Sequence, residues 1–168
     1  MQNGNRRCSL ESRHTEIHDT IKLSKVRPFI VKDQGFLVPK QSVFNKIVAD
    51  SGFELKVAGF LDGCEDIVSF VKNSVSTGFN VEYQKADGSI AKYYPDFLVK
   101  QTEAEIFVVE TKGREDLDDP PKWARLQQWC LDATAQDGRR VFTPLFVREE
   151  DYGEYQPKDF AGLCAMAI

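Results

Sequence analysis

One segment, residues 93–113, constrains the fold more than any other part of the chain; its sequence is YYPDFLVKQTEAEIFVVETKG. It contains two runs rich in β-branched and aromatic residues, 97–99 and 106–109, separated by the polar stretch QTEAE. Apolar runs of this kind with a polar turn between them predict two antiparallel strands. A turn at the centre of QTEAE makes the outer ends of the two strands neighbours.

The outer ends of this predicted hairpin carry charged residues. With the turn at that position, Asp96 and Glu110 lie opposite each other across the two strands. Side chains alternate along a strand, so Glu110 and Lys112 project from the same face while Thr111 points away. Two carboxylates and one ammonium group are therefore expected at the end of strands that are otherwise apolar. Unpaired charge in such a place is costly and usually functional.

Two facing carboxylates with a lysine beside them are typical of a divalent cation site. Hard oxygen ligands suit Mg²⁺, which commonly takes one or two protein carboxylates and keeps several waters; Mn²⁺ is the alternative ion. Such an ion can polarise a phosphodiester and make a bound water more acidic, with Lys112 beside the attacking water or the developing negative charge. The competing interpretation is a salt bridge between Glu110 and Lys112 at the edge of a sheet, which composition alone makes common.

The first half of the chain has short β-favouring runs followed by helical spacing. Residues 1–40 hold the β-favouring runs and are expected as an extended segment. Apolar residues at helical spacing favour a helix over 41–48, and one kinked helix or two short ones over 55–71.

The second half of the chain alternates strand and helix patterns. Strand patterns at 79–84, 89–99 and 106–112 predict a three-stranded antiparallel meander. A helix over 120–133 and a final strand over 139–147 follow. The predicted fold is thus an α/β domain in the order α-β-β-β-α-β, with a central mixed sheet of about four strands flanked by helices.

Three segments are expected along the chain. They are an N-terminal β-rich segment at 1–40, a core at 41–150 and a C-terminal tail at 151–168.

Charge and composition limit the classes of partner. The formal net charge of −4 argues against a general affinity for nucleic acid, but residues 1–50 alone hold nine Lys or Arg against five Asp or Glu. No apolar run is long enough to cross a membrane, and the polar start of the chain has no signal-like region, so we expect a cytoplasmic protein without a membrane partner. The four cysteines lie far apart and are expected as free thiols.

The order of these motifs resembles the PD-(D/E)xK nuclease superfamily, in which Pro95-Asp96 would supply the first acid and Glu110-Thr111-Lys112 the second acid and the lysine. A wider series resembles the C-terminal endonuclease domain of the Res subunits of type III restriction enzymes. Its members are SGFE at 51–54, DIVSFVKN at 66–73, GFNVEY at 78–83, YYPDFLV at 93–99, ETKG at 110–113, and Lys122 with QQWC at 127–130. The resemblance covers about residues 40–147 and implies a restriction-endonuclease-like core.

The resemblance also implies roles for individual residues. Asp96 and Glu110 would be metal ligands, the backbone carbonyl of Thr111 a third ligand, and Lys112 the catalytic lysine. Glu54 matches a glutamate on the first core helix that approaches the metal or a second ion. Its competing interpretation is a glutamate favoured at a helix N-terminus by the helix dipole.

Three further residues match family positions that are often polar or basic: Lys72, Asn73 and Lys122. They are expected either to contact the phosphate backbone of a nucleic acid or to brace the site. The competing interpretation is a solvated surface.

The expected function is that of a Mg²⁺-dependent DNA endonuclease which hydrolyses phosphodiester bonds as the cleavage domain of a type III restriction-like system. Expected partners are DNA, a helicase motor or methylation-recognition subunit, and a second copy of the chain in a homodimer. The sequence holds no GxxxxGKS or GxxxxGKT phosphate loop, so ATP dependence does not carry over. The alternatives are a non-catalytic DNA-binding or assembly module with a nuclease fold, and a related nuclease acting on RNA or DNA junctions.

Overall fold

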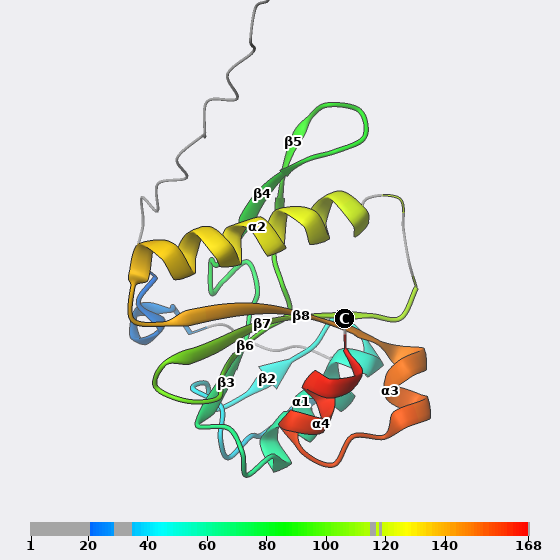
Figure 1. The fold of residues 1–168 in the computed structure, drawn as a ribbon. Coiled ribbons are helices and arrows are strands. Elements are labelled where there is room, and N and C mark those ends of the chain that lie inside the picture. Colours follow the sequence, from blue (N-terminus) through cyan, green and yellow to red (C-terminus); the bar gives the residue numbers. More distant parts are fainter. Residues whose placement is uncertain (1–20, 29–34, 115–116, 118, 168) are drawn as a thin grey trace, which may run out of the picture.

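The structure is a computed structural model that describes residues 21–28, 35–114, 117 and 119–167 (Figure 1). In chain order, its elements are η1 (Leu23–Lys25), β1 (Phe36–Leu37), β2 (Ile47–Val48), α1 (Gly52–Gly63), β3 (Ser69–Lys72), β4 (Val81–Gln84), β5 (Ile90–Tyr93), β6 (Phe97–Lys100), β7 (Glu105–Lys112), α2 (Asp119–Asp137), β8 (Val141–Arg148), α3 (Glu149–Tyr155) and α4 (Phe160–Met166).

A four-stranded sheet in the order β3-β6-β7-β8 forms the centre of the fold. The pairs β3-β6 and β6-β7 are antiparallel, whereas β7 and β8 are parallel because α2 carries the chain back between them. The predicted mixed α/β fold with a central four-stranded sheet flanked by helices is confirmed. The hairpin register is confirmed as well: Phe97 pairs with Val109, so Asp96 and Glu110 are the next positions outward.

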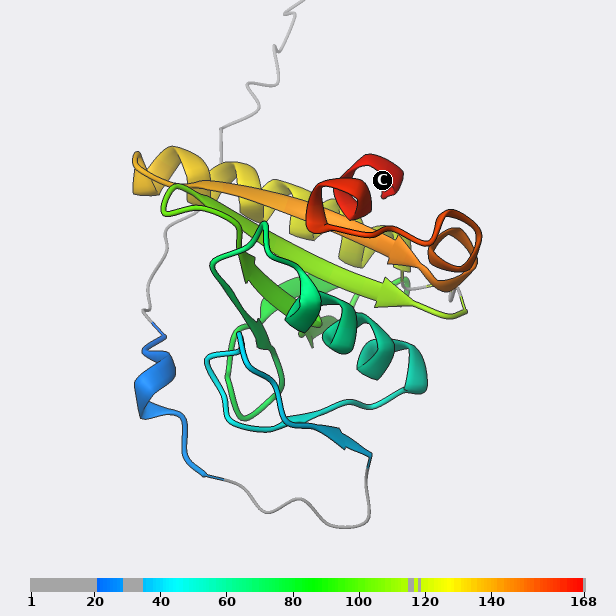
Figure 2. The same ribbon diagram turned by 90° about the horizontal axis from the view of Figure 1, so that it is seen from below.

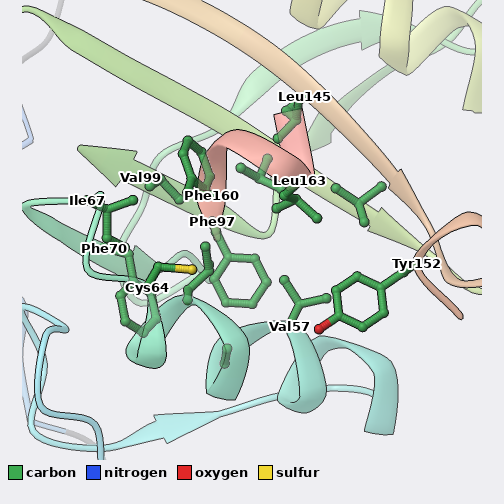
Figure 3. Close-up of a cluster of buried hydrophobic side chains, with 14 of the residues drawn as sticks. Val57, Cys64, Ile67, Phe70, Phe97, Val99, Leu145, Tyr152, Phe160 and Leu163 are labelled. Atoms are coloured by element: carbon green, nitrogen blue, oxygen red, sulfur yellow. The ribbon is translucent and has the colours of Figure 1, made fainter. Parts of the chain in front are cut away.

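Helices cover both faces of this sheet (Figures 1 and 2). On one face, α1, α3 and α4 enclose a core that includes Phe97 and Val109 of the sheet (Figure 3). On the other face, α2 and the β4-β5 ribbon pack around Val108 and Leu126. Neighbouring residues of β7 thus enter opposite cores, as the alternation of a strand requires. Glu110 and Lys112 therefore lie on the α2 face with Val108.

Two predicted helices are wrong. Residues 69–72, expected as the second part of a helix, form β3, which pairs with β6. Its buried positions are consecutive because β3 is covered on both faces, and a short apolar run of this kind has no period that separates strand from helix.

The helix expected over 41–48 is replaced by extended chain and the short strand β2. The backbone there hydrogen-bonds to β3, with Val43 N donating to Phe70 O and Phe70 N donating to Gln41 O. The apolar residues at helical spacing in this segment therefore lie in extended chain beside β3, the edge strand of the central sheet.

The predicted three-stranded meander is also corrected, since its long middle strand is broken at Pro95. The part before Pro95 is β5, which pairs only with β4 in a separate two-stranded ribbon, and the part after it is β6 in the central sheet. Proline has no N–H for a strand ladder, so a continuous strand through this position is disfavoured. The break places Asp96 at the start of β6.

Residues near the C-terminus, expected as a tail from 151 onward, form α3 and α4. Tyr152, Phe160 and Leu163 are buried in the same core as Val57 of α1 (Figure 3). The N–H groups of Phe160 and Ala161 at the start of α4 donate to the Asp66 carboxylate.

Two composition-based expectations bear on the described residues. None of the described helices is both long and apolar enough to cross a bilayer. Cys64, Cys130 and Cys164 are free thiols, while Cys8 lies outside the described residues.

Candidate active site

The charged residues of the predicted hairpin meet at one end of the central sheet. Asp96 precedes β6, and Glu110, Thr111 and Lys112 are the last three residues of β7, which runs antiparallel to β6. Lys72, the last residue of β3, pairs with Phe97 at the same end of the sheet. Three neighbouring strands therefore bring these five residues together.

The Asp96 carboxylate is held by donors on both of its oxygens. Its Oδ2 accepts from the Thr111 backbone N–H at 2.8 Å and from the Thr111 hydroxyl at 2.7 Å. Its Oδ1 accepts from Lys72 Nζ at 3.0 Å. A carboxylate oxygen has room for two acceptor bonds, so Oδ1 retains a position for a further ligand.

Lys72 links Asp96 to the first helix. Its Nζ lies 3.0 Å from Glu54 Oε2 as well as 3.0 Å from Asp96 Oδ1, and the side chain is only 9% exposed. Burial alone would lower the pKa of the Lys72 ammonium, but the carboxylates of Asp96 and Glu54 outweigh it and raise that pKa. Lys72 is therefore a buried positive charge shared by two acids.

Glu54 caps the helix N-terminus and also makes a contact with Lys72 that the sequence did not predict. It is the third residue of α1, where its N–H donates to Ser51 Oγ, and its carboxylate accepts from Asp50 N and Ser51 Oγ. This arrangement caps the helix N-terminus. The same carboxylate is paired with Lys72, so Glu54 reaches Asp96 through the lysine.

Glu110 is the most perturbed acid at this end of the sheet. Burial raises its pKa to about 8, and the nearby Asp96 carboxylate acts in the same direction. The Tyr93 hydroxyl and the ammonium groups of Lys112 and Lys72 oppose this shift without cancelling it.

One oxygen of this carboxylate lacks a well-formed hydrogen bond. Glu110 Oε2 and the Tyr93 hydroxyl are both buried and make no hydrogen bond of normal geometry with a described residue, although the hydroxyl is near enough to act as a weak donor that lowers the Glu110 pKa. A buried acceptor without a well-placed donor costs free energy, and such groups need an explanation in a native fold.

The Lys112 side chain, at the end of β7, is held by Asp119 at the start of α2. Its Nζ lies 2.7 Å from Asp119 Oδ1, and Lys122 Nζ lies 3.7 Å from the same oxygen. Lys122 also approaches the ring of Tyr83, with its Nζ 5.8 Å from the ring centroid. The two lysines thus share one acidic partner on the α2 face of the sheet.

Asn73 is buried at 1% exposure and binds the segment that carries Asp96. Its backbone N–H donates to Asp96 O at 2.7 Å, and its side-chain amide donates to Pro95 O at 2.7 Å and to Phe79 O at 2.8 Å. Through these contacts Asn73 holds the backbone in place at Pro95 and Asp96, where the predicted long strand is broken.

We expect Asn73→Ala to lower the free energy of unfolding by about 2 kcal/mol, because two carbonyls lose their donors inside the protein. Urea denaturation monitored by circular dichroism measures the change. The matched control is Gln84→Ala, which removes a similar amide-to-carbonyl bond from an exposed side chain and should cost less than about 0.5 kcal/mol. Equal losses in the two variants would contradict the bracing role.

Sequence reasoning missed two residues of this site. They are Asp119 and Tyr93, and no motif in the sequence assigns either of them to the site. Their proximity to Lys112 and Glu110 depends on how α2 and the β4-β5 ribbon dock on the sheet, which local spacing does not encode. The one available signal was their closeness in sequence to the motif, with Tyr93 three residues before Asp96 and Asp119 seven residues after Lys112.

The donor set fits a hard divalent cation with two protein carboxylates. Asp96 has an acceptor position left on Oδ1, and Glu110 has a buried oxygen without a well-formed hydrogen bond. Within the described residues, no group of three or more His, Cys, Asp or Glu side chains could hold a metal by itself. Magnesium commonly accepts one or two carboxylates and completes its shell with water and phosphate oxygens, so this set is sufficient.

Comparison with known proteins gives one match. The family model described as "Endonuclease domain" (RE_endonuc) matches residues 40–130, which include α1, β3, the β4-β5 ribbon, β6, β7 and the first half of α2. No curated protein and no solved structure matches the chain. The match spans more than half of the chain and contains every residue of the site described above, and the chain belongs to the endonuclease-domain family.

Proposed function

We propose that this nuclease domain is a metal-dependent endonuclease that hydrolyses phosphodiester bonds of DNA. The observation that carries the proposal is the meeting of Asp96, Glu110 and Lys112 at one sheet end, where the Glu110 pKa is raised and its Oε2 lacks a well-formed hydrogen bond. A buried acid of this kind beside a second acid favours a bound cation. The family match supports nuclease chemistry in the part of the chain that contains these residues.

Asp96 and Glu110 would hold the cation, with the Thr111 carbonyl as a further ligand. Magnesium, or manganese in its place, supplies polarisation of the phosphodiester and a more acidic water when bound. The Thr111 N–H and hydroxyl orient Asp96 by their bonds to Oδ2, so its Oδ1 faces a fixed direction. A ligand that is already oriented loses little entropy on binding.

Lys112 is suited to stabilise negative charge on the phosphate. Its ammonium is paired with Asp119, and a lysine in such a pair carries its proton and donates hydrogen bonds. Lys122 shares the Asp119 partner on the α2 face. Lys112 would bind and orient the reacting phosphate during in-line attack by water, and Lys122 would contact the neighbouring phosphate backbone.

Lys72 and Asn73 would act through Asp96. Lys72 balances the charges of Asp96 and Glu54, and Asn73 fixes the backbone at Pro95 and Asp96. Both are therefore positioning residues. Their burial leaves little of either side chain for direct contact with nucleic acid.

We further propose that the domain serves a type III restriction-like system. The motif series over 51–130 supports this, and the sequence has no phosphate loop of its own. A motor or methylation-recognition subunit, or a second copy of the chain, would then supply the sequence recognition.

The test is cleavage of supercoiled plasmid with Mg²⁺, with Mn²⁺ or with EDTA, beside the Asp96→Asn variant. We expect nicked or linear product from the wild type with either metal, and none with EDTA or from Asp96→Asn. Calorimetric titration of the metal alone provides a readout that needs no partner protein. Absence of metal binding by the folded wild type would contradict the site, and cleavage of RNA but not DNA would contradict the substrate.

A further inference from the structure

A cavity of about 480 Å³ lies where the N-terminal segment meets the loop after β3. It is lined by Ile21, Lys22, Lys25, Val26, Arg27, Pro28, Ser76 and Thr77. Three of these residues are cations and two carry hydroxyl groups, and none of the described lining residues is acidic. Lys22, Lys25 and Arg27 are all exposed, so their charges face solvent. Figure 2 shows η1 and its flanking residues, in blue, along one side of the molecule.

This cavity is adjacent to a second one that reaches the site. The second cavity, of about 180 Å³, shares Ser76 and Thr77 with the first and is also lined by Lys46, Lys72 and Asn73. Lys72 Nζ in turn lies 3.0 Å from Asp96 Oδ1. The two adjoining cavities, called the path below, therefore extend from the N-terminal cations along the loop after β3 to the end of β3 that carries Lys72.

The charge along this path is opposite to that of the whole chain. The chain has a net charge of −4, yet the described residues that line the two cavities include four exposed cations, Lys22, Lys25, Arg27 and Lys46, and one acid, Asp50. A row of cations with interspersed hydroxyls matches the repeating phosphates of a polynucleotide, which bind mainly through Lys, Arg and hydroxyl donors.

We propose that Lys22, Lys25 and Arg27, with Ser76, bind the sugar-phosphate backbone of the nucleic acid strand that leads into the active site. This inference rests on the proposed function and assigns its substrate path. The three cations lie before residue 40, outside the part of the chain that matches the endonuclease family.

The test uses the full chain with Lys22, Lys25 and Arg27 all replaced by alanine. The control variant replaces Arg139, Arg140 and Lys158, which are exposed, line neither cavity, and give the same change of net charge. Fluorescence anisotropy with a labelled DNA duplex in EDTA, over a series of salt concentrations, gives affinity without cleavage. Thermal unfolding of each variant checks the fold.

We expect the first variant to bind DNA at least about tenfold more weakly, with a shallower dependence of log affinity on log salt by about 0.9 for each lost phosphate contact. The control should bind within about twofold of the wild type, because non-specific charge alone contributes little at a distance beyond the Debye length. In plasmid cleavage with Mg²⁺, the first variant should show a raised KM with an unchanged single-turnover rate at saturation.

The path would be overturned if the first variant bound DNA with the affinity and salt dependence of the control. This holds whether both variants bind like the wild type or both bind equally more weakly. If the wild type still cleaves with Mg²⁺ in either case, the nuclease assignment stands and only the path is wrong. Failure of the wild type both to bind DNA and to cleave it would overturn the path together with the DNA substrate.

Discussion

Replacing Lys112 by alanine is expected to lower the single-turnover rate of DNA cleavage by about 100- to 1,000-fold, the usual cost of removing one donor to developing negative charge. The fold should change little, because the buried partner of Lys112 keeps a second cation. Asp119 Oδ1 lies 3.7 Å from Lys122 Nζ as well as 2.7 Å from Lys112 Nζ. Removing one lysine thus does not leave the acid alone, and the large penalty of an unpaired buried charge is avoided.

Lys122→Ala is the matched control for this prediction. It removes the other ammonium near Asp119 and makes the same change of net charge. If Lys122 contacts only the phosphate backbone, its loss raises KM and leaves the rate at saturating DNA close to that of the wild type. Rapid-quench cleavage at saturating substrate, with thermal unfolding in parallel, separates the two lysines. A Lys112→Ala variant that cleaves at the wild-type rate would contradict the catalytic role and favour a non-catalytic DNA-binding module.

The sequence predicted the part of the site that lies within one hairpin. The positions of Asp96 and Glu110 follow from a turn in QTEAE, since strand register is set locally by the turn and the alternation of side chains. The observed pairing of Phe97 with Val109 agrees with this prediction. The same alternation placed Glu110 and Lys112 on one face.

The remaining structure depends on contacts between distant segments. β3 was predicted as helix because burial on both faces removes the period that distinguishes a strand. The pairing of Lys72 with Glu54 and Asp96 requires β3 to be a strand, so that prediction error also hid the ion pairs. Asp119 and Tyr93 reach the site only through the docking of α2 and the ribbon, which no local pattern specifies.

Replacing Glu110 by glutamine is expected to change cleavage and stability in opposite directions. Cleavage should be lost, because a neutral amide is a poor ligand for Mg²⁺. The metal-free protein should instead become more stable than the wild type at high pH. Glu110 is a buried acid whose pKa is raised to about 8 by burial and by the Asp96 carboxylate, so its ionised form is unfavourable in the folded state.

The direction of the pH dependence follows from the two pKa values. An unfolded chain releases this proton near the ordinary value of 4.5, whereas the folded protein holds it until about pH 8. Between these values the folded state binds more protons, so the wild type loses stability as the pH rises, by at most about 1.4 kcal/mol per pH unit. Above about pH 8 Glu110 is ionised in both states, and the stability of the wild type falls no further from this group. Glutamine does not titrate, so Glu110→Gln should lack this contribution.

Groups facing Glu110 also affect this titration. They are Tyr93 from β5, Asp96 before β6, Lys112 on the same strand and Lys72 from β3. All four are unchanged in the variant, so the difference between variant and wild type reports mainly on Glu110 itself. A matched control is Glu105→Gln, the same substitution at the exposed opposite end of β7. It should leave the pH dependence of the wild type unchanged.

Chemical denaturation in EDTA across the range from about pH 5 to about pH 9 tests the prediction. The stability of Glu110→Gln relative to the wild type should increase with pH and then level off. Added Mg²⁺ should stabilise the wild type more at high pH than at low pH, since the ion must displace the Glu110 proton below about pH 8, and it should not stabilise the variant. If the stability difference between Glu110→Gln and the wild type is constant with pH, Glu110 is already ionised in the metal-free fold. That result would contradict a cation bound at Glu110 Oε2.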